Sequence, residues 1–94
     1  MKVVPGKMAE DMELMEKHIA ITSRLGMPPF RVYRLVSGEG DVMHTVIYET
    51  EWDSLAAMEA FFDKLMADPE MQALTLQWDP VIESHGFEVY TPMP

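Results

Sequence analysis

Residues 8–25, with the sequence MAEDMELMEKHIAITSRL, form the most strongly patterned segment of the chain. At about 100° per residue, the apolar side chains fall in one half of a helical wheel and most of the charged ones in the other. The apolar half holds Met8, Met12, Leu14, Met15, Ile19, Ile21 and Leu25. The pattern predicts an amphipathic helix over residues 7–25. Gly26 is expected to end it, because glycine suits the C-terminal cap of a helix.

Three polar side chains interrupt the centre of this apolar half: Asp11, His18 and Thr22. A carboxylate in apolar surroundings must be paired, partly hydrated or protonated, and such a site is one way to make a general base. Asp11 and His18 lie two turns apart, about 10 Å along the axis, so they could line one small-molecule cavity from its two ends. A structural interpretation stays open beside this one. In it Lys7 pairs with Asp11 and His18 is a satisfied core histidine.

The bulk properties exclude several classes of protein. Ninety-four residues correspond to one domain, residues 1–94. A net charge of −9 argues against a nucleic-acid surface, and no apolar run approaches the roughly 20 residues of a membrane span. No signal peptide is visible, and the absence of cysteine excludes disulfides and thiol catalysis. We therefore expect a cytoplasmic protein that binds neither nucleic acid nor a membrane.

The rest of the chain alternates strand-like and helix-like patterns. Strands are predicted over residues 2–4, 30–37, 42–52 and 83–91. The second and third form a hairpin around the turn at 38–41. A second helix is predicted over 55–67, capped by Asp53 or Ser54, and a short third helix begins at Pro69 and ends before Pro80. The order βαββα(α)β predicts a ferredoxin-like α+β sandwich. Helices would cover one face of its sheet, and a second copy of the chain would cover the other in a homodimer.

These features resemble the dimeric α+β barrel superfamily, most closely its NIPSNAP-like and antibiotic-biosynthesis-monooxygenase-like members. The resemblance rests on residues 4–7 leading into the first helix, Gly26 at its end, the hairpin turn, residues 51–55 opening the second helix, and residues 68–70 after it. It implies a homodimer with a pocket between sheet and helices in each subunit. Members include cofactor-free monooxygenases, haem-degrading enzymes and polyketide cyclases. An apolar or aromatic residue is expected at position 11 in such members, so Asp11 departs from that expectation.

Other candidate site residues come from the predicted strands and the third helix. His44 shares a strand face with Tyr48 and could face a pocket or serve the sheet. Four aromatic residues could form flat walls for a ligand or pack the core and the dimer interface: Tyr33, Tyr48, Trp52 and Trp78. Arg31 and Arg34 could pair with Glu49 or Glu51, or one of them could hold a ligand oxyanion. No two histidines have metal-ligand spacing, so no metal and no cofactor are expected.

Three functions fit this sequence. In the first, the protein is a cofactor-free enzyme in which Asp11 abstracts a proton from an aromatic or polyketide-like substrate, while His18, His44 or Tyr33 stabilises the oxyanion. The pocket would be lined by Met15, Thr22, Tyr33, Tyr48, Trp52 and Trp78. In the second, a NIPSNAP-like dimer binds a small aromatic or apolar ligand without turnover. In the third, the dimer is purely structural and Asp11 is ion-paired. A cofactor-independent monooxygenase is a further possibility by family analogy alone.

Overall fold

The computed structural model describes residues 1–38 and 40–93. Two positions named in the predictions, Glu39 in the 38–41 turn and the terminal Pro94, lie outside the described residues. The elements follow the predicted order. They are β1 (Lys2–Val3), α1 (Met8–Arg24), β2 (Phe30–Arg34), β3 (Val46–Thr50), α2 (Leu55–Ala67), α3 (Pro69–Trp78), the 3₁₀ helix η1 (Asp79–Val81) and β4 (Ile82–Ser84).

The strands form two antiparallel pairs, β2 with β3 and β1 with β4. Backbone hydrogen bonds join the pairs. The amide of Val46 donates to the carbonyl of Met1 and the amide of Val3 to that of His44, each over 2.7 Å, and an antiparallel bridge links Lys2 with Thr45. The order in space is therefore β4, β1, β3, β2. The fold is the predicted ferredoxin-like α+β arrangement.

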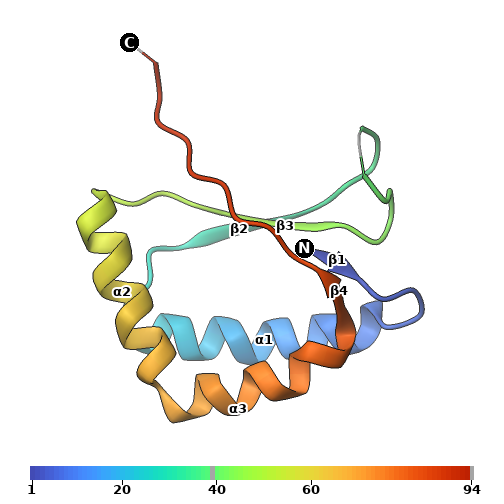
Figure 1. The fold of residues 1–94 in the computed structure, drawn as a ribbon, viewed down its shortest axis with the longest axis horizontal. Helices are drawn as coiled ribbons and strands as arrows, with labels where there is room; N and C mark the ends of the chain where they lie inside the picture. The colour runs from blue at the N-terminus through green and yellow to red at the C-terminus, as the bar shows by residue number, and fades with distance from the viewer. Residues whose placement is uncertain (39, 94) are drawn as a thin grey trace.

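The helices lie on one side of the strands. Figure 1 shows α1 and α3 side by side beneath them, with α2 standing at one end and leading into α3. The core fills the space between these layers, because the amphipathic stripe of α1 faces both the strands and α3. Its buried side chains are Val3, Leu14, Ile21, Val46, Phe61, Leu65, Met71, Leu74, Trp78 and Val81. No helix of the described residues is both long and apolar enough to cross a bilayer.

The strand register separates two faces of the β2–β3 hairpin. On one face Phe30, Val32 and Arg34 lie opposite Thr50, Tyr48 and Val46 in turn. Val46 belongs to the buried core, so this inner face is directed toward the helices. On the outer face Arg31 lies opposite Glu49 and Tyr33 opposite Ile47.

Both later helices begin at the predicted positions, and each has a side-chain cap. The Ser54 hydroxyl accepts a hydrogen bond from the amide of Ala57 over 3.1 Å, which settles the choice between Asp53 and Ser54. The Asp68 carboxylate accepts from the amide of Met71 over 3.1 Å, with Pro69 in the first turn of α3. Asp68 also accepts from Arg24 over 2.8 Å, which ties the end of α1 to the start of α3.

All four strands are shorter than predicted, the first by one residue and the other three by more. Residues 42–44 form a turn, in which Met43 has a φ of 78° and the Thr45 hydroxyl donates to the Asp41 carbonyl over 2.8 Å. β3 therefore begins at Val46, and its partner β2 ends at Arg34. The prediction of a strand over 83–91 is wrong beyond Ser84. β1 contributes only Lys2 and Val3 to the pairing, so residues 85–93 have no strand beside them and form no regular structure.

Candidate functional site

Asp11 is buried where α1 meets α3. Its side chain belongs to the core stripe of α1, and the residue is only 1% exposed. The indole Nε1–H of Trp78 donates to Asp11 Oδ1 over 2.7 Å. The other carboxylate oxygen, Oδ2, is buried and has no hydrogen-bond partner among the described residues. Burying a carboxylate oxygen in this state is costly, so this atom is the first sign of a functional site.

His18 lies two turns further along α1, on the same face of the helix. Its ring centroid is 5.2 Å from that of Trp78 on α3, 6.3 Å from that of Tyr48 on β3 and 5.9 Å from that of Phe30 on β2. Its Nδ1 is buried and unpartnered among the described residues. Burial lowers the pKa of His18 from its ordinary value of 6.5, because the imidazolium is poorly solvated there.

Tyr48 brings a third unpartnered polar atom to the same region. Its hydroxyl is buried, and no described residue lies within hydrogen-bond distance of it. Burial raises the pKa of this phenol far above 10.0, and the negative charge of Asp11 raises it further. Tyr48 therefore remains a neutral hydrogen-bond donor at every physiological pH. We call Asp11, His18, Tyr48 and Trp78 the buried polar cluster.

The buried polar cluster offers complementary hydrogen-bonding groups. Asp11 Oδ2 accepts, Tyr48 donates or accepts, and the role of His18 Nδ1 depends on its tautomer. Aromatic rings surround these atoms, including Phe30, whose ring centroid lies 5.8 Å from that of Tyr48. Such a set suits a flat molecule that carries a polar group. No group of three or more acidic, histidine or cysteine side chains in the described residues could hold a metal ion.

The family comparison covers nearly the whole chain. Residues 2–94 match the NIPSNAP family model. The chain belongs to the NIPSNAP family. No curated protein and no solved structure matches it. This membership confirms the predicted resemblance, and it agrees with the ferredoxin-like fold. The chemistry of this NIPSNAP protein follows from its own side chains.

Two further predicted site residues of the NIPSNAP chain adjoin the buried polar cluster on α1. Thr22 is completely buried, but its hydroxyl donates to the His18 carbonyl over 2.8 Å and is therefore satisfied within the helix. Met15 is half-buried and packs against the core. Thr22 thus fixes the backbone that carries His18, whereas Met15 is a candidate lining residue.

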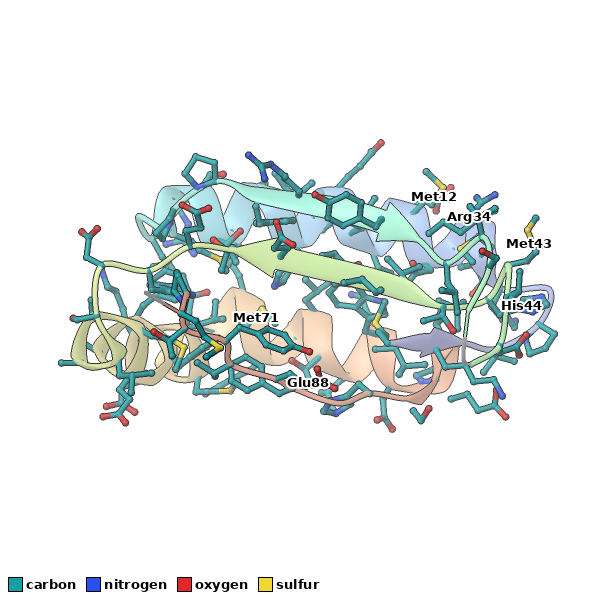
Figure 2. The ribbon with its side chains drawn as sticks, turned by 90° about the horizontal axis from the view of Figure 1, so that it is seen from above. Met12, Arg34, Met43, His44, Met71 and Glu88 are labelled. Atoms are coloured by element: carbon teal, nitrogen blue, oxygen red, sulfur yellow. The ribbon has the colours of Figure 1, made fainter. Side chains whose placement is uncertain are left out.

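The remaining predicted residues lie elsewhere. His44 is in the turn before β3, where its Nδ1 lies 3.2 Å from Asp41 Oδ1, and Figure 2 shows it at the loop end of the molecule. Tyr33 is on the outer face of the hairpin. Trp52 packs against α2, with its ring centroid 5.4 Å from that of Phe61. The structure therefore does not bring His44, Tyr33 and Trp52 together with the buried polar cluster.

Two hollows formed by described residues lie away from the buried polar cluster. One of about 390 Å³ lies where the hairpin leads into α2, lined by Pro28, Pro29, Phe30, Arg31, Glu49, Thr50, Glu51, Trp52 and Asp53. The other, of about 420 Å³, lies between α1 and α3, lined by Lys17, Ala20, Ile21, Arg24, Glu70, Ala73, Leu74 and Gln77.

Sequence reasoning missed two features of the site. Trp78 was expected as a flat wall, but its indole N–H holds the Asp11 carboxylate. Phe30 was not singled out, although it contacts both His18 and Tyr48. The alternation along β2 places Phe30 on the inner face and is the signal that could have identified it.

Proposed function

We propose that this NIPSNAP protein binds a small aromatic molecule that donates a hydrogen bond to Asp11. One observation carries the proposal: Asp11 Oδ2, His18 Nδ1 and the Tyr48 hydroxyl are all buried and have no hydrogen-bond partner among residues 1–38 and 40–93. Leaving each of them unsatisfied costs about 1–3 kcal/mol. The hydroxyl group of a phenol would donate a hydrogen bond to Asp11 Oδ2 and accept a hydrogen bond from the Tyr48 hydroxyl.

The test compares para-coumaramide, an uncharged phenol, with its methyl ether, which cannot donate from that oxygen. We expect the wild-type protein to bind the phenol about tenfold more tightly, as one charge-assisted hydrogen bond provides. Asp11→Asn should remove this preference. Trp78 holds the acceptor oxygen of the amide, so the new Nδ2 donor occupies the place of Oδ2. Calorimetry would measure both affinities in each protein.

Tyr48→Phe provides a second arm with a matched control. It should weaken phenol binding several-fold, because the accepted hydrogen bond is lost. Tyr33→Phe makes the same chemical change on the outer face of the hairpin and should leave the affinity unchanged. Equal affinities for phenol and ether in the wild-type protein, or a preference that survives in Asp11→Asn, would refute the proposal.

A second candidate function is proton abstraction by Asp11. The observation that favours it is the difference between the two carboxylate oxygens of Asp11. Oδ1 accepts a hydrogen bond from Trp78, whereas Oδ2 has no partner among the described residues and can accept a proton. Nitrobenzisoxazole is a suitable probe. Its ring carbon gives a proton to the carboxylate, the electron pair forms the nitrile, and the N–O bond breaks to release a coloured phenolate.

For this candidate we expect Asp11→Asn to lower the rate of ring opening by about 100-fold or more. Glu10→Gln is the matched control, because Glu10 is an exposed neighbour paired with Lys7 over 3.2 Å. The colour change gives the rate directly in a spectrophotometer. Equal rates in the wild-type protein and Asp11→Asn would eliminate Asp11 as the base.

We also propose that the protein acts as a homodimer through the outer face of the hairpin. Tyr33 and Ile47 lie opposite each other there and are 43% and 45% exposed. Arg31 and Glu49, an exposed ion pair within the protomer over 3.5 Å, flank this apolar pair on the same face. Ile47→Glu should convert the dimer to a monomer in light scattering, whereas Glu49→Gln should not. A monomeric wild-type protein at micromolar concentration would disprove this interface.

A further inference from the structure

Arg34 differs from the other basic residues of this acidic chain. The sequence has seven lysines and arginines against 16 acidic residues. Within residues 1–38 and 40–93, six of the seven have a hydrogen-bond or ion-pair partner: Lys2, Lys7, Lys17, Arg24, Arg31 and Lys64. Arg34 has none among these described residues. A guanidinium that pairs with none of the described carboxylates in such an acidic chain can bind an anion from outside the chain.

The register places Arg34 on the side of the hairpin that faces the helices. It lies opposite Val46, at the end of the inner row that begins with Phe30. Figure 1 shows β2 and α1 running in opposite directions. Phe30 at the start of β2 contacts His18 of α1. The four residues from Phe30 to Arg34 extend about 13 Å along the strand, which is the length of about nine residues of α-helix. This step reaches the turn of α1 that carries Asp11, and Figure 2, seen from above, draws Arg34 and Met12 toward the same end of the molecule.

An apolar edge lies along this part of α1. One side of α1 contacts α3. On that side Lys17 donates a hydrogen bond to Gln77, and Arg24 pairs with Asp68 at the start of α3. The opposite flank carries Met12, Met15 and Ile19. With Val32 of β2, these four residues form what we call the β2–α1 edge. Met12 is 48% exposed and Val32 is 39% exposed. Methionine side chains adapt easily to flat ligands, so this partly exposed edge suits an aromatic ring.

We propose that the ligand is an aromatic monocarboxylate that also carries a hydroxyl group. Its carboxylate binds Arg34, its ring lies against the β2–α1 edge, and its hydroxyl donates to Asp11. This inference rests on the proposed ligand-binding function and adds the chemical class of the ligand. Arg34 is a specificity-determining residue in this arrangement, because it selects the charged end of the molecule.

The test uses para-coumarate and its uncharged amide, which differ only at the end assigned to Arg34. Although the protein carries a net charge of −9, we expect it to bind the carboxylate about tenfold more tightly than the amide. Arg34→Gln should abolish that advantage and leave amide binding unchanged. Arg31→Gln is the matched control. It removes the same charge from the outer face, where Arg31 lies 3.5 Å from Glu49, and it should retain the advantage.

The outcomes separate this inference from the function on which it rests. Two results would overturn the inference and leave the proposed function standing. In the first, the wild-type protein binds the amide as tightly as the carboxylate. In the second, Arg34→Gln still binds the carboxylate more tightly than the amide. An equal loss in Arg31→Gln would indicate a general charge effect and would also overturn it. If neither probe binds, both proposals are refuted. In that case, amide signals of Met12 and Val32 that change with protein concentration would show a second copy of the chain covering the edge.

Discussion

Replacing Trp78 by phenylalanine is expected to lower the free energy of unfolding by about 3 kcal/mol. The variant keeps an aromatic ring in the core but removes the indole N–H that donates to Asp11 over 2.7 Å. Because Asp11 Oδ2 has no partner either, the buried carboxylate would lose its only hydrogen bond among the described residues. In a domain of this size the melting temperature should fall by about 15 °C. Thermal and urea unfolding followed by circular dichroism would measure the change.

Two comparisons decide whether this loss comes from the hydrogen bond. Trp52→Phe makes the same substitution at the other tryptophan, which packs on Phe61 and Phe62, and should cost about 1 kcal/mol or less. The double variant Asp11→Leu, Trp78→Phe replaces both partners by apolar groups and should recover most of the lost stability. If the double variant is no more stable than Trp78→Phe alone, the buried hydrogen bond is not the cause.

The fold was largely predictable because its signals are local. The stripe on α1, the caps at Ser54 and Asp68 and the hairpin around residues 38–41 each depend on residues close together in the chain. Helix existence and order follow from such signals, and the family match over residues 2–94 agrees with them. The strand ends depend instead on what lies beside them. Residues 85–89 alternate like a strand, but β1 contributes only Lys2 and Val3 as partners.

The site was predictable only in part, because its decisive contacts are distant in sequence. The pattern on α1 identified Asp11 and His18 as polar side chains on an apolar face, and both are indeed directed into the protein interior. Their partners were not predictable. Trp78 is 67 positions from Asp11, and no periodicity relates α1 to α3 at that distance. The expected pair of Lys7 with Asp11 does not form, since Lys7 lies on the exposed side with Glu10.

His44 shows how a small backbone change moves a candidate residue out of a site. The prediction placed it on the same strand face as Val46 and Tyr48. The turn at residues 42–44, with its positive φ at Met43, removes it from the strand before pairing begins. Its side chain then pairs with Asp41 in the loop. Of the three residues predicted to stabilise an oxyanion, His44 therefore lies in the loop, and the polar side chain of β3 beside His18 is Tyr48.

The burial of His18 predicts that the protein loses stability as the pH falls below the ordinary histidine pKa of 6.5. Its pKa is lowered in the folded state because burial disfavours the imidazolium. Below the ordinary value of 6.5, the unfolded chain binds a proton at His18 that the folded chain does not. Stability is therefore fully present above that value and is lost as the pH falls toward the folded-state pKa. One proton sets the limit at about 1.4 kcal/mol per pH unit.

His18→Phe should flatten this pH dependence, because phenylalanine keeps the ring contacts with Phe30, Tyr48 and Trp78 but cannot bind a proton. His85→Phe is the control, since His85 is exposed beyond β4. His44 and Asp41 are present in all three proteins, so the difference in slope isolates His18. Urea unfolding at a series of pH values would show equal slopes in the wild-type protein and His18→Phe if His18 were solvated. Such a result would mean that the folded protein accepts a protonated His18. The buried polar cluster would then not require a neutral imidazole beside Tyr48.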